Sequence, residues 1–143
     1  MKDLQKMGGI AALYEAAAYV LGIIFFILVV NYDGVVDPVE KVALLAENQA
    51  GLYIMNLIIY VIFGLFLVVL TLALYERLKA GSPAIVQTAT VFGMIWATVI
   101  IASGMIFISG MENVVDLYGK DPAQATTVWL AIDSVYDGFG GNS

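Results

Sequence analysis

Cysteine and histidine are both absent from the 143 residues of this chain. Their absence excludes disulfides, thiolate nucleophiles, most zinc sites, histidine-ligated haem and Ser-His-Asp catalysis. Basic residues are scarce, since six Lys and Arg stand against twelve Asp and Glu, for a net charge of −6. Such a chain offers no basic patch for nucleic acid and no polybasic arm for anionic lipids. No catalytic motif is found, and we predict a non-enzymatic protein that holds no metal or cofactor.

Charge of either sign is rare, because charged residues make up 13% of the chain and hydrophobic residues 62%. The stretch from Leu52 to Tyr75 carries no charged residue at all. A hydrocarbon core of about 30 Å requires roughly 20 apolar residues in a helix. The sequence therefore predicts an all-α integral membrane protein that lies in the lipid bilayer. We expect one membrane domain over residues 1–143, with three transmembrane helices at about 10–30, 52–75 and 84–108.

Proline and glycine mark the connections between these spans. The Asp37-Pro38 and Asp121-Pro122 pairs are typical of helix starts, with Asp as the N-cap and Pro at the first helical position. They predict short interfacial helices near 38–50 and 123–136. The turn residues Asn31 to Gly34 should end the first span, and Gly110 should close the third. The short Gly81–Pro83 link predicts that the second and third spans are antiparallel neighbours.

The few basic residues are unevenly distributed, and this predicts an orientation. One side of the predicted topology carries Lys2, Lys6, Arg77 and Lys79, and the other carries Lys41 and Lys120. By the positive-inside rule, the N-terminus is cytoplasmic and the C-terminal segment lies outside the cytoplasmic membrane. Acidic residues collect on the outer side: Asp33, Asp37, Glu40, Glu47, Glu112, Asp116, Asp121, Asp133 and Asp137. Three interpretations of this acidic face stay open: it gathers cations, it repels a like-charged partner, or it is merely solvated.

Small residues recur at helical spacing within the spans. Such residues let transmembrane helices approach closely, because lipid offers no hydrophobic drive for association. We predict helix-packing contacts at Gly8, Ala12, Ala16, Gly22, Gly64, Ala89, Gly93 and Ala97. Packing faces of this kind favour a homo-oligomer or a place in a larger membrane complex.

Glu15 is the one charged residue within the first predicted span. Placing a carboxylate at that depth costs free energy, so we expect it to have a polar partner or a functional role. We predict an inner-leaflet polar cluster around it, formed with Tyr19, Asn56, Tyr60, Thr71, Tyr75 and Arg77. The cluster has two open interpretations: a proton, cation or ligand-headgroup site, or a satisfied carboxyl that holds helices together.

Four stretches resemble a family of small prokaryotic multi-pass membrane proteins, the domain-of-unknown-function 4386 type. They are LYEAAAYVLGI, DPVEKVALLAENQA, YERLKAGSPAIVQTATVFGMIWA and VVDLYGKDPAQATTVWLAIDSVYDGFGG. The resemblance covers essentially the whole chain and implies a helical membrane fold, but it implies no activity and no functional residues. Family members continue into further spans after the glycine-rich stretch, so we expect this domain to be incomplete at its C-terminus.

Two functions fit these observations. The first is an accessory or scaffold subunit that packs against itself or a larger membrane complex. The alternative is a protein that binds or transports a lipid or a small apolar ligand, using the polar cluster around Glu15.

Overall fold

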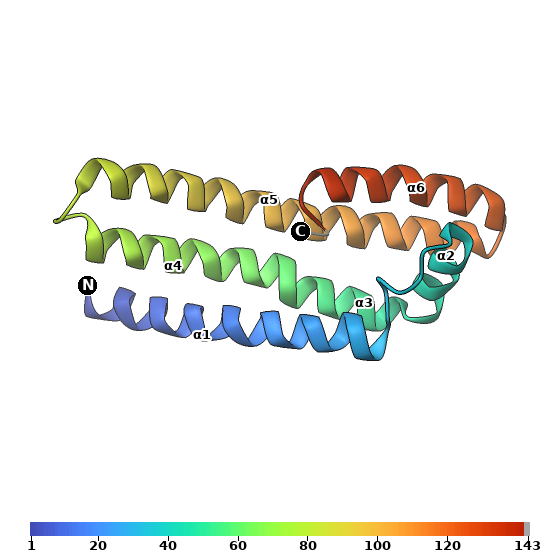
Figure 1. The fold of residues 1–143 in the computed structure, drawn as a ribbon, viewed down its shortest axis with the longest axis horizontal. Helices are drawn as coiled ribbons and strands as arrows, with labels where there is room; N and C mark the ends of the chain where they lie inside the picture. Colours follow the sequence, from blue (N-terminus) through green and yellow to red (C-terminus); the bar gives the residue numbers. More distant parts are fainter. Residues whose placement is uncertain (142–143) are drawn as a thin grey trace.

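Three long helices lie side by side in the computed structural model, which describes residues 1–141 (Figure 1). Helix α1 (Lys2–Ile24) runs into a π-helical segment, η1 (Phe25–Val29). The second rod is continuous and consists of α3 (Gln49–Asn56), η2 (Leu57–Ile62) and α4 (Phe63–Leu78). The third is α5 (Pro83–Tyr118). All three are long and apolar enough to cross a membrane, which confirms the three predicted spans.

Helix α4 lies between α1 and α5 and packs against both. The N-terminus and the α4–α5 link lie at one end of the rods, while α2 (Pro38–Glu47) lies at the other end (Figure 1). Helix α6 (Pro122–Gly138) runs antiparallel to α5 and covers its second half. The arrangement is therefore a three-helix layer with two shorter helices gathered at one end.

Both Asp-Pro pairs start helices as predicted. The Asp37 carboxylate accepts hydrogen bonds from the backbone N–H of Val39 at 2.8 Å and of Glu40 at 3.2 Å. The Asp121 carboxylate accepts one from Gln124 N–H at 3.1 Å. In each case the side chain satisfies a donor that the first helical turn leaves unpaired, and Pro occupies a position that needs no N–H.

Helix α5 does not end near Gly110 but continues to Tyr118. Beyond Ile108 the pattern changes from uniformly apolar to amphipathic: Met111 and Val114 are buried, while Glu112 and Asp116 are exposed. Gly110 serves packing at this point, because a Cβ there would overlap the Ile132 side chain of α6. The extension of α5 forms a buried core with α2 and α6 that includes Val42, Leu45, Met111, Val114, Ala125 and Trp129.

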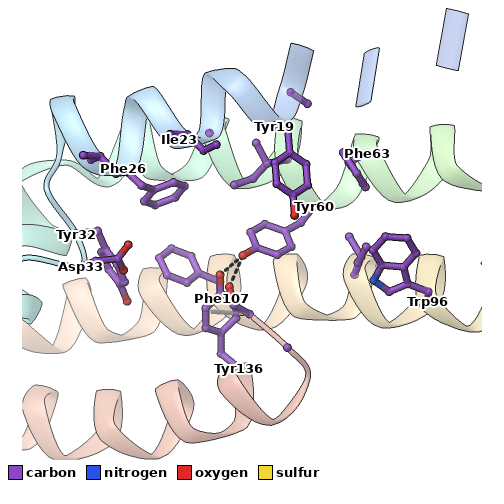
Figure 2. Close-up of a pocket in the computed structure, with 17 residues that line it drawn as sticks. Tyr19, Ile23, Phe26, Tyr32, Asp33, Tyr60, Phe63, Trp96, Phe107 and Tyr136 are labelled. Carbon is purple, nitrogen blue, oxygen red and sulfur yellow. Dashed lines mark hydrogen bonds between the residues drawn. The ribbon is translucent and has the colours of Figure 1, made fainter. Parts of the chain in front are cut away.

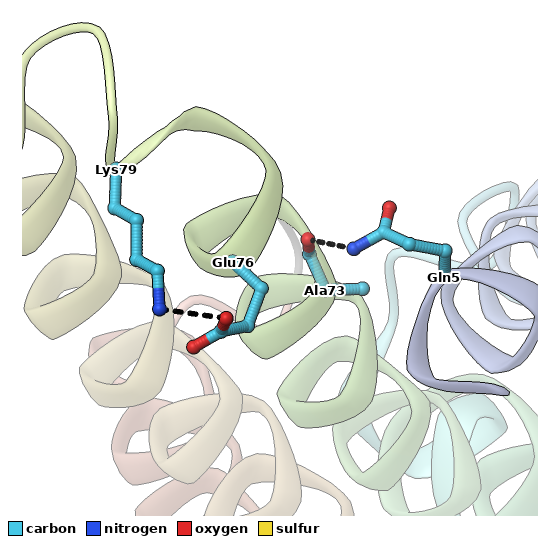
Figure 3. Close-up of polar contacts among 4 residues, drawn as sticks. All are labelled: Gln5, Ala73, Glu76 and Lys79. Atoms are coloured by element: carbon cyan, nitrogen blue, oxygen red, sulfur yellow. Dashed lines mark hydrogen bonds and ion pairs between the residues drawn. The ribbon is translucent and has the colours of Figure 1, made fainter. Parts of the chain in front are cut away.

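The opposite end of the layer is held by a close approach between α1 and α4. The Gln5 side-chain amide donates a hydrogen bond to the Ala73 carbonyl at 2.8 Å (Figure 3). One turn further on, Gly8 lies directly against Ala73 Cβ, with no room for a side chain. Lys79 pairs with Glu76 at 2.7 Å on the neighbouring turn of α4 (Figure 3). The small residue and the amide together fix the start of α1 on α4.

The predicted turn after the first span depends on Asn31, which has a left-handed backbone with φ of 50°. This residue ends the helical rod and turns Tyr32 into the interior, where it is 4% exposed. Asparagine adopts this conformation readily, whereas a β-branched residue is strained in it.

We expect Asn31→Val to lower the free energy of unfolding by about 1–2 kcal/mol, since the left-handed region penalises a β-branched side chain. Asn31→Gly is the control and should remain close to the parent, because glycine accepts this backbone freely. Thermal unfolding in detergent, followed by circular dichroism, measures both. Equal stability of the two variants would contradict a role for the backbone conformation.

Candidate ligand-binding groove

A groove with a cavity volume of about 320 Å³ lies between α1 and α5, with the middle rod as its floor (Figure 2). Its walls are mostly apolar and aromatic. The lining residues include Tyr19, Ile23, Phe26, Tyr60, Phe63, Trp96, Phe107 and Tyr136. Because α1 and α5 each pack on α4, the space between them stays open along part of their length.

Aromatic side chains concentrate at the end of the groove nearest α2. Phe107 lies at their centre and is 1% exposed. Its ring centroid is 6.0 Å from that of Tyr32, 5.2 Å from that of Tyr136 and 5.6 Å from that of Trp129. These distances are typical of favourable tilted and edge-to-face aromatic pairs. One buried aromatic cluster therefore joins α5, α6 and the turn after α1.

Two phenol hydroxyls and the end of the described chain form a hydrogen-bonded group in the groove. Tyr136 O–H donates to the Tyr60 hydroxyl, and Tyr60 O–H donates to the Gly141 carbonyl (Figure 2). Ser103 O–H also donates to the Phe139 carbonyl at 3.0 Å. These bonds hold the segment after α6 against α5 and the floor, so residues far apart in sequence close one side of the groove.

Tyr32 places a further hydroxyl at this end of the groove, in a buried setting. Its oxygen has no hydrogen-bond partner within the described chain. Burial raises the pKa of the Tyr32 phenol, and the carboxylates of Asp133, Asp137 and Asp33 raise it further. The phenol is therefore neutral over the physiological range and can donate to or accept from a bound molecule.

A second, smaller recess of about 240 Å³ lies next to the groove. Apolar side chains make up half of its lining, namely Val35, Val36, Pro38 and Leu130, and the other half carries polar or charged groups. Asp33 lines both spaces. The recess also contains Lys41 of α2 together with Trp129 and Asp133 of α6. Lys41 Nζ lies 3.9 Å from the centroid of the Tyr32 ring, within cation–π range. The apolar groove and the recess therefore meet at Asp33, beside the aromatic cluster.

The Asp133 carboxyl has an unfavourable environment in this recess. Its Oδ1 is buried without a hydrogen-bond partner among residues 1–141. Burial raises the pKa of Asp133 above 3.8, Asp137 raises it further, and Lys41 of α2 lowers it. Asp33, in the turn that precedes α2, also lines the recess. Because the folded-state pKa is raised, the contribution of Asp133 to the free energy of unfolding is most favourable at low pH and falls as pH rises from about 3.8 through the raised pKa.

Asp133→Asn should therefore raise the melting temperature at neutral pH by about 3 °C, because the amide carries no charge to desolvate. The gain should vanish at a pH below 3.8, where the parent carboxyl is itself protonated. Thermal unfolding across this pH range measures the effect. A melting temperature that falls at neutral pH would show that the carboxylate stabilises the fold.

The members of the polar cluster predicted around Glu15 have different surroundings in the structure. Tyr19 and Tyr60 line the groove, but Glu15, Asn56, Thr71, Tyr75 and Arg77 are not among its lining residues. Glu15 Oε1 is buried and accepts no hydrogen bond from the described residues. Asn56 is fully buried and donates to the Leu52 carbonyl of its own helix at 2.9 Å. Thr71 lies against Gly93 of α5.

The predicted small residues divide into two groups. Gly8, Gly22, Gly64, Gly93 and Ala97 lie at contacts between helices. A Cβ on Gly64 would approach the Ala97 carbonyl oxygen to 3.0 Å, and one on Gly22 would approach Ile59 to 3.3 Å. Ala12, Ala16 and Ala89 are exposed on the outer faces of α1 and α5. The first group therefore packs the layer, while the second faces outward.

Sequence reasoning did not select Tyr32, Phe107, Trp129 or Tyr136 as site residues. Tyr32 lies within the predicted turn from Asn31 to Gly34, and no sequence motif contains Phe107, Trp129 or Tyr136. A usable signal was the placement of a large aromatic residue between turn-forming neighbours, since exposed turns rarely need one.

The fold and the groove define a helical membrane protein with three spans and an aromatic cavity between the first and third. Residues 15–140 match the family described as Domain of unknown function (DUF4386). Because that match covers most of the chain, the protein belongs to this family, as its sequence resemblance predicted. No curated protein and no solved structure matches the chain.

Proposed function

We propose that the protein binds an apolar molecule with a single long chain in the groove between α1 and α5, in a non-enzymatic role. The observation that carries this proposal is the aromatic cavity between membrane-length helices. Its volume of about 320 Å³ lies at the low end of the roughly 300–1,000 Å³ of ligand pockets. Apolar walls with a few hydroxyl groups are also the composition that such pockets have.

The two π-helical segments support the proposal. Phe26 and Ile27 of η1 line the groove from one wall, and Ile59 and Tyr60 of η2 line its floor. π-helical turns are rare and are frequently found at functional sites. Finding both segments at the same cavity favours a binding role for it.

The proposed orientation follows from the charges at the two ends of the layer. The end with the N-terminus and the α4–α5 link carries Lys2, Lys6, Arg77 and Lys79 (Figure 1). Under the positive-inside rule this end is cytoplasmic, within the cytoplasmic membrane. The aromatic end of the groove and the recess then lie toward the outer leaflet.

Photo-labelling with a matched pair of variants tests the groove. Ile23 and Ile24 are adjacent on α1 with exposures of 53% and 44%, but only Ile23 lines the groove. The probe is a hexadecanol analogue with a photoactivatable group, added to the protein in phosphatidylcholine vesicles. We expect labelling of groove residues that excess hexadecanol suppresses. Ile23→Trp should reduce this labelling about fivefold by filling the space, and Ile24→Trp should leave it unchanged.

Two results would contradict the proposal. One is uniform labelling of all lipid-facing side chains that excess hexadecanol does not suppress, with Leu13 labelled as strongly as Phe63. The other is an equal loss of labelling in Ile23→Trp and Ile24→Trp, because that would separate labelling from the groove.

A second candidate function is an accessory subunit that packs against a second copy or a larger membrane complex. The specific observation in its favour is that the small residues Ala12, Ala16 and Ala89 are exposed on the surface of the described chain. Cysteine pairs at Ala12 should then crosslink two copies in vesicles, since the parent has no cysteine. A monomer that gives no crosslink at Ala12, Ala16 or Ala89 would exclude self-association through these faces.

A further inference from the structure

The recess beside the groove contains both negatively charged acceptors and hydrogen-bond donors, one of which is positively charged. Asp33 and Asp133 contribute carboxylates. Lys41 contributes an ammonium group, and Trp129 is the one residue of its lining with an indole N–H. A carboxylate accepts hydrogen bonds, whereas an ammonium group and an indole N–H only donate them. The recess therefore offers acceptors for a cation and donors for an anion within one small space.

Two of these groups are buried without a partner. Trp129 is 1% exposed and its Nε1 makes no hydrogen bond in the described part of the chain. Asp133 Oδ1 is also buried and has no hydrogen-bond partner among the described residues. A buried polar atom without a partner costs about 1–3 kcal/mol, so its retention requires an explanation. A bound molecule that supplies both a donor and an acceptor would satisfy both atoms.

The recess adjoins the groove and lies beyond the end of the first membrane-length helix. The first membrane-length helix ends at Val29, and Asp33 follows four positions later in the sequence. Lipid headgroups lie at this level, just beyond the hydrocarbon core. Asp33 lines both the recess and the groove, so a molecule with its chain in the groove can place its polar end in the recess.

We infer that the recess binds a phosphoethanolamine headgroup, with Asp33 and Asp133 holding the ammonium and with Lys41 and Trp129 Nε1–H holding the phosphate. This inference rests on the proposed function, since the acyl chain of the same molecule occupies the groove. The ligand class is thus a single-chain, zwitterionic amphiphile with a primary amine.

The primary amine matters because it carries three N–H donors that can reach the partnerless Asp133 oxygen, whereas a trimethylated amine has none. A purely anionic headgroup would face two carboxylates and a single Lys. A metal ion is a poorer fit, because residues 1–141 bring no three acidic side chains together in a metal-holding group.

Binding to lysolipids in dodecyl maltoside micelles tests the inference. The unmodified protein is used, and binding is followed by its intrinsic tryptophan fluorescence, to which Trp96 of the groove and Trp129 of the recess both contribute. The probes are palmitoyl lysolipids with ethanolamine, choline or glycerol headgroups, and free phosphoethanolamine. We expect the ethanolamine lysolipid to bind about tenfold more tightly than the other two, since it alone forms charge-assisted hydrogen bonds with both carboxylates.

Variants separate the headgroup from the chain. Asp133→Asn should lower the affinity for the ethanolamine lysolipid about tenfold and leave the glycerol lysolipid unchanged. Asp116→Asn is the control, because Asp116 is exposed and pairs with Lys120 at the outer end of α5. Ile23→Trp should weaken all three lysolipids together. Native mass spectrometry supplies an independent count of bound molecules, and the melting temperature of each variant establishes that it is folded.

The outcomes distinguish the two proposals. Equal binding of the three lysolipids, unaffected by Asp133→Asn but abolished by Ile23→Trp, would overturn the headgroup inference and leave the groove function standing. Failure of all three lysolipids to bind would overturn both. Binding of free phosphoethanolamine as tightly as its lysolipid would show a headgroup site that does not use the groove, and would overturn the joint ligand.

Discussion

The Gly64→Val variant is expected to lose about 3 kcal/mol or more of its free energy of unfolding. Gly64 lies at the crossing of α4 and α5, where a Cβ would overlap the Ile101 side chain and approach the Ala97 carbonyl oxygen to 3.0 Å. The backbone oxygen cannot move without moving α5, so the helices must separate. Transmembrane helices depend on such close approach, because the lipid supplies no hydrophobic drive to compensate.

Unfolding in mixed micelles, followed by circular dichroism and by protease sensitivity of the α4–α5 link, measures this effect. Gly9→Val is the matched control, since nothing lies within 4 Å of a Cβ at Gly9. Both changes introduce valine into an apolar span, so the intrinsic helix preference changes alike. Similar losses in the two variants would show that close packing at Gly64 does not hold α4 against α5.

The second large effect is expected for Phe107→Ala, which should cost about 3–5 kcal/mol. Phe107 is 1% exposed and contacts three rings, one from the turn after η1 and two from α6. Removing it leaves a cavity among Tyr32, Trp129 and Tyr136 that these residues cannot collapse into without losing their own positions. The groove would lose its end wall at the same time.

Phe92→Ala tests the same substitution on the same helix, and Phe92 is 67% exposed. We expect this control to remain within about 0.5 kcal/mol of the parent. When both variants and the parent also carry Trp96→Phe, Trp129 is the only tryptophan. Its fluorescence should then shift to the red in Phe107→Ala as the indole becomes hydrated. An unshifted spectrum with unchanged stability would contradict the central place of Phe107 in the aromatic cluster.

The sequence was a sufficient guide to the three spans, because crossing a membrane imposes length and uniform apolarity on each of them. It also predicted both Asp-Pro helix starts, since capping is a local interaction. The length of α5 was not predictable in the same way. Gly110 resembled a helix end in the sequence, but it lies against Ile132 of a helix that is distant in the chain.

The groove was only partly predictable for a similar reason. Tyr19 and Tyr60 were predicted from the sequence as members of the polar cluster around Glu15. Tyr136 joins Tyr60 across 76 positions of the chain, and no local pattern reports such a contact. The predicted link between Glu15 and the end of α4 needed Thr71, Tyr75 and Arg77 to turn toward α1. Thr71 instead faces α5, because Gly93 leaves room for it there.

The wide turns at η2 have a consequence for how the cavity can vary among related chains. A π-helical turn contains one more residue than an α-helical turn. Deleting a single residue from Leu57–Ile62 would return this segment to regular α-helical turns, so the rod would stay continuous while the side chains within the segment changed direction. Tyr60 would leave the floor of the cavity while the bilayer crossing survived. Length differences in this six-residue segment would therefore change the shape of the cavity from one related chain to another.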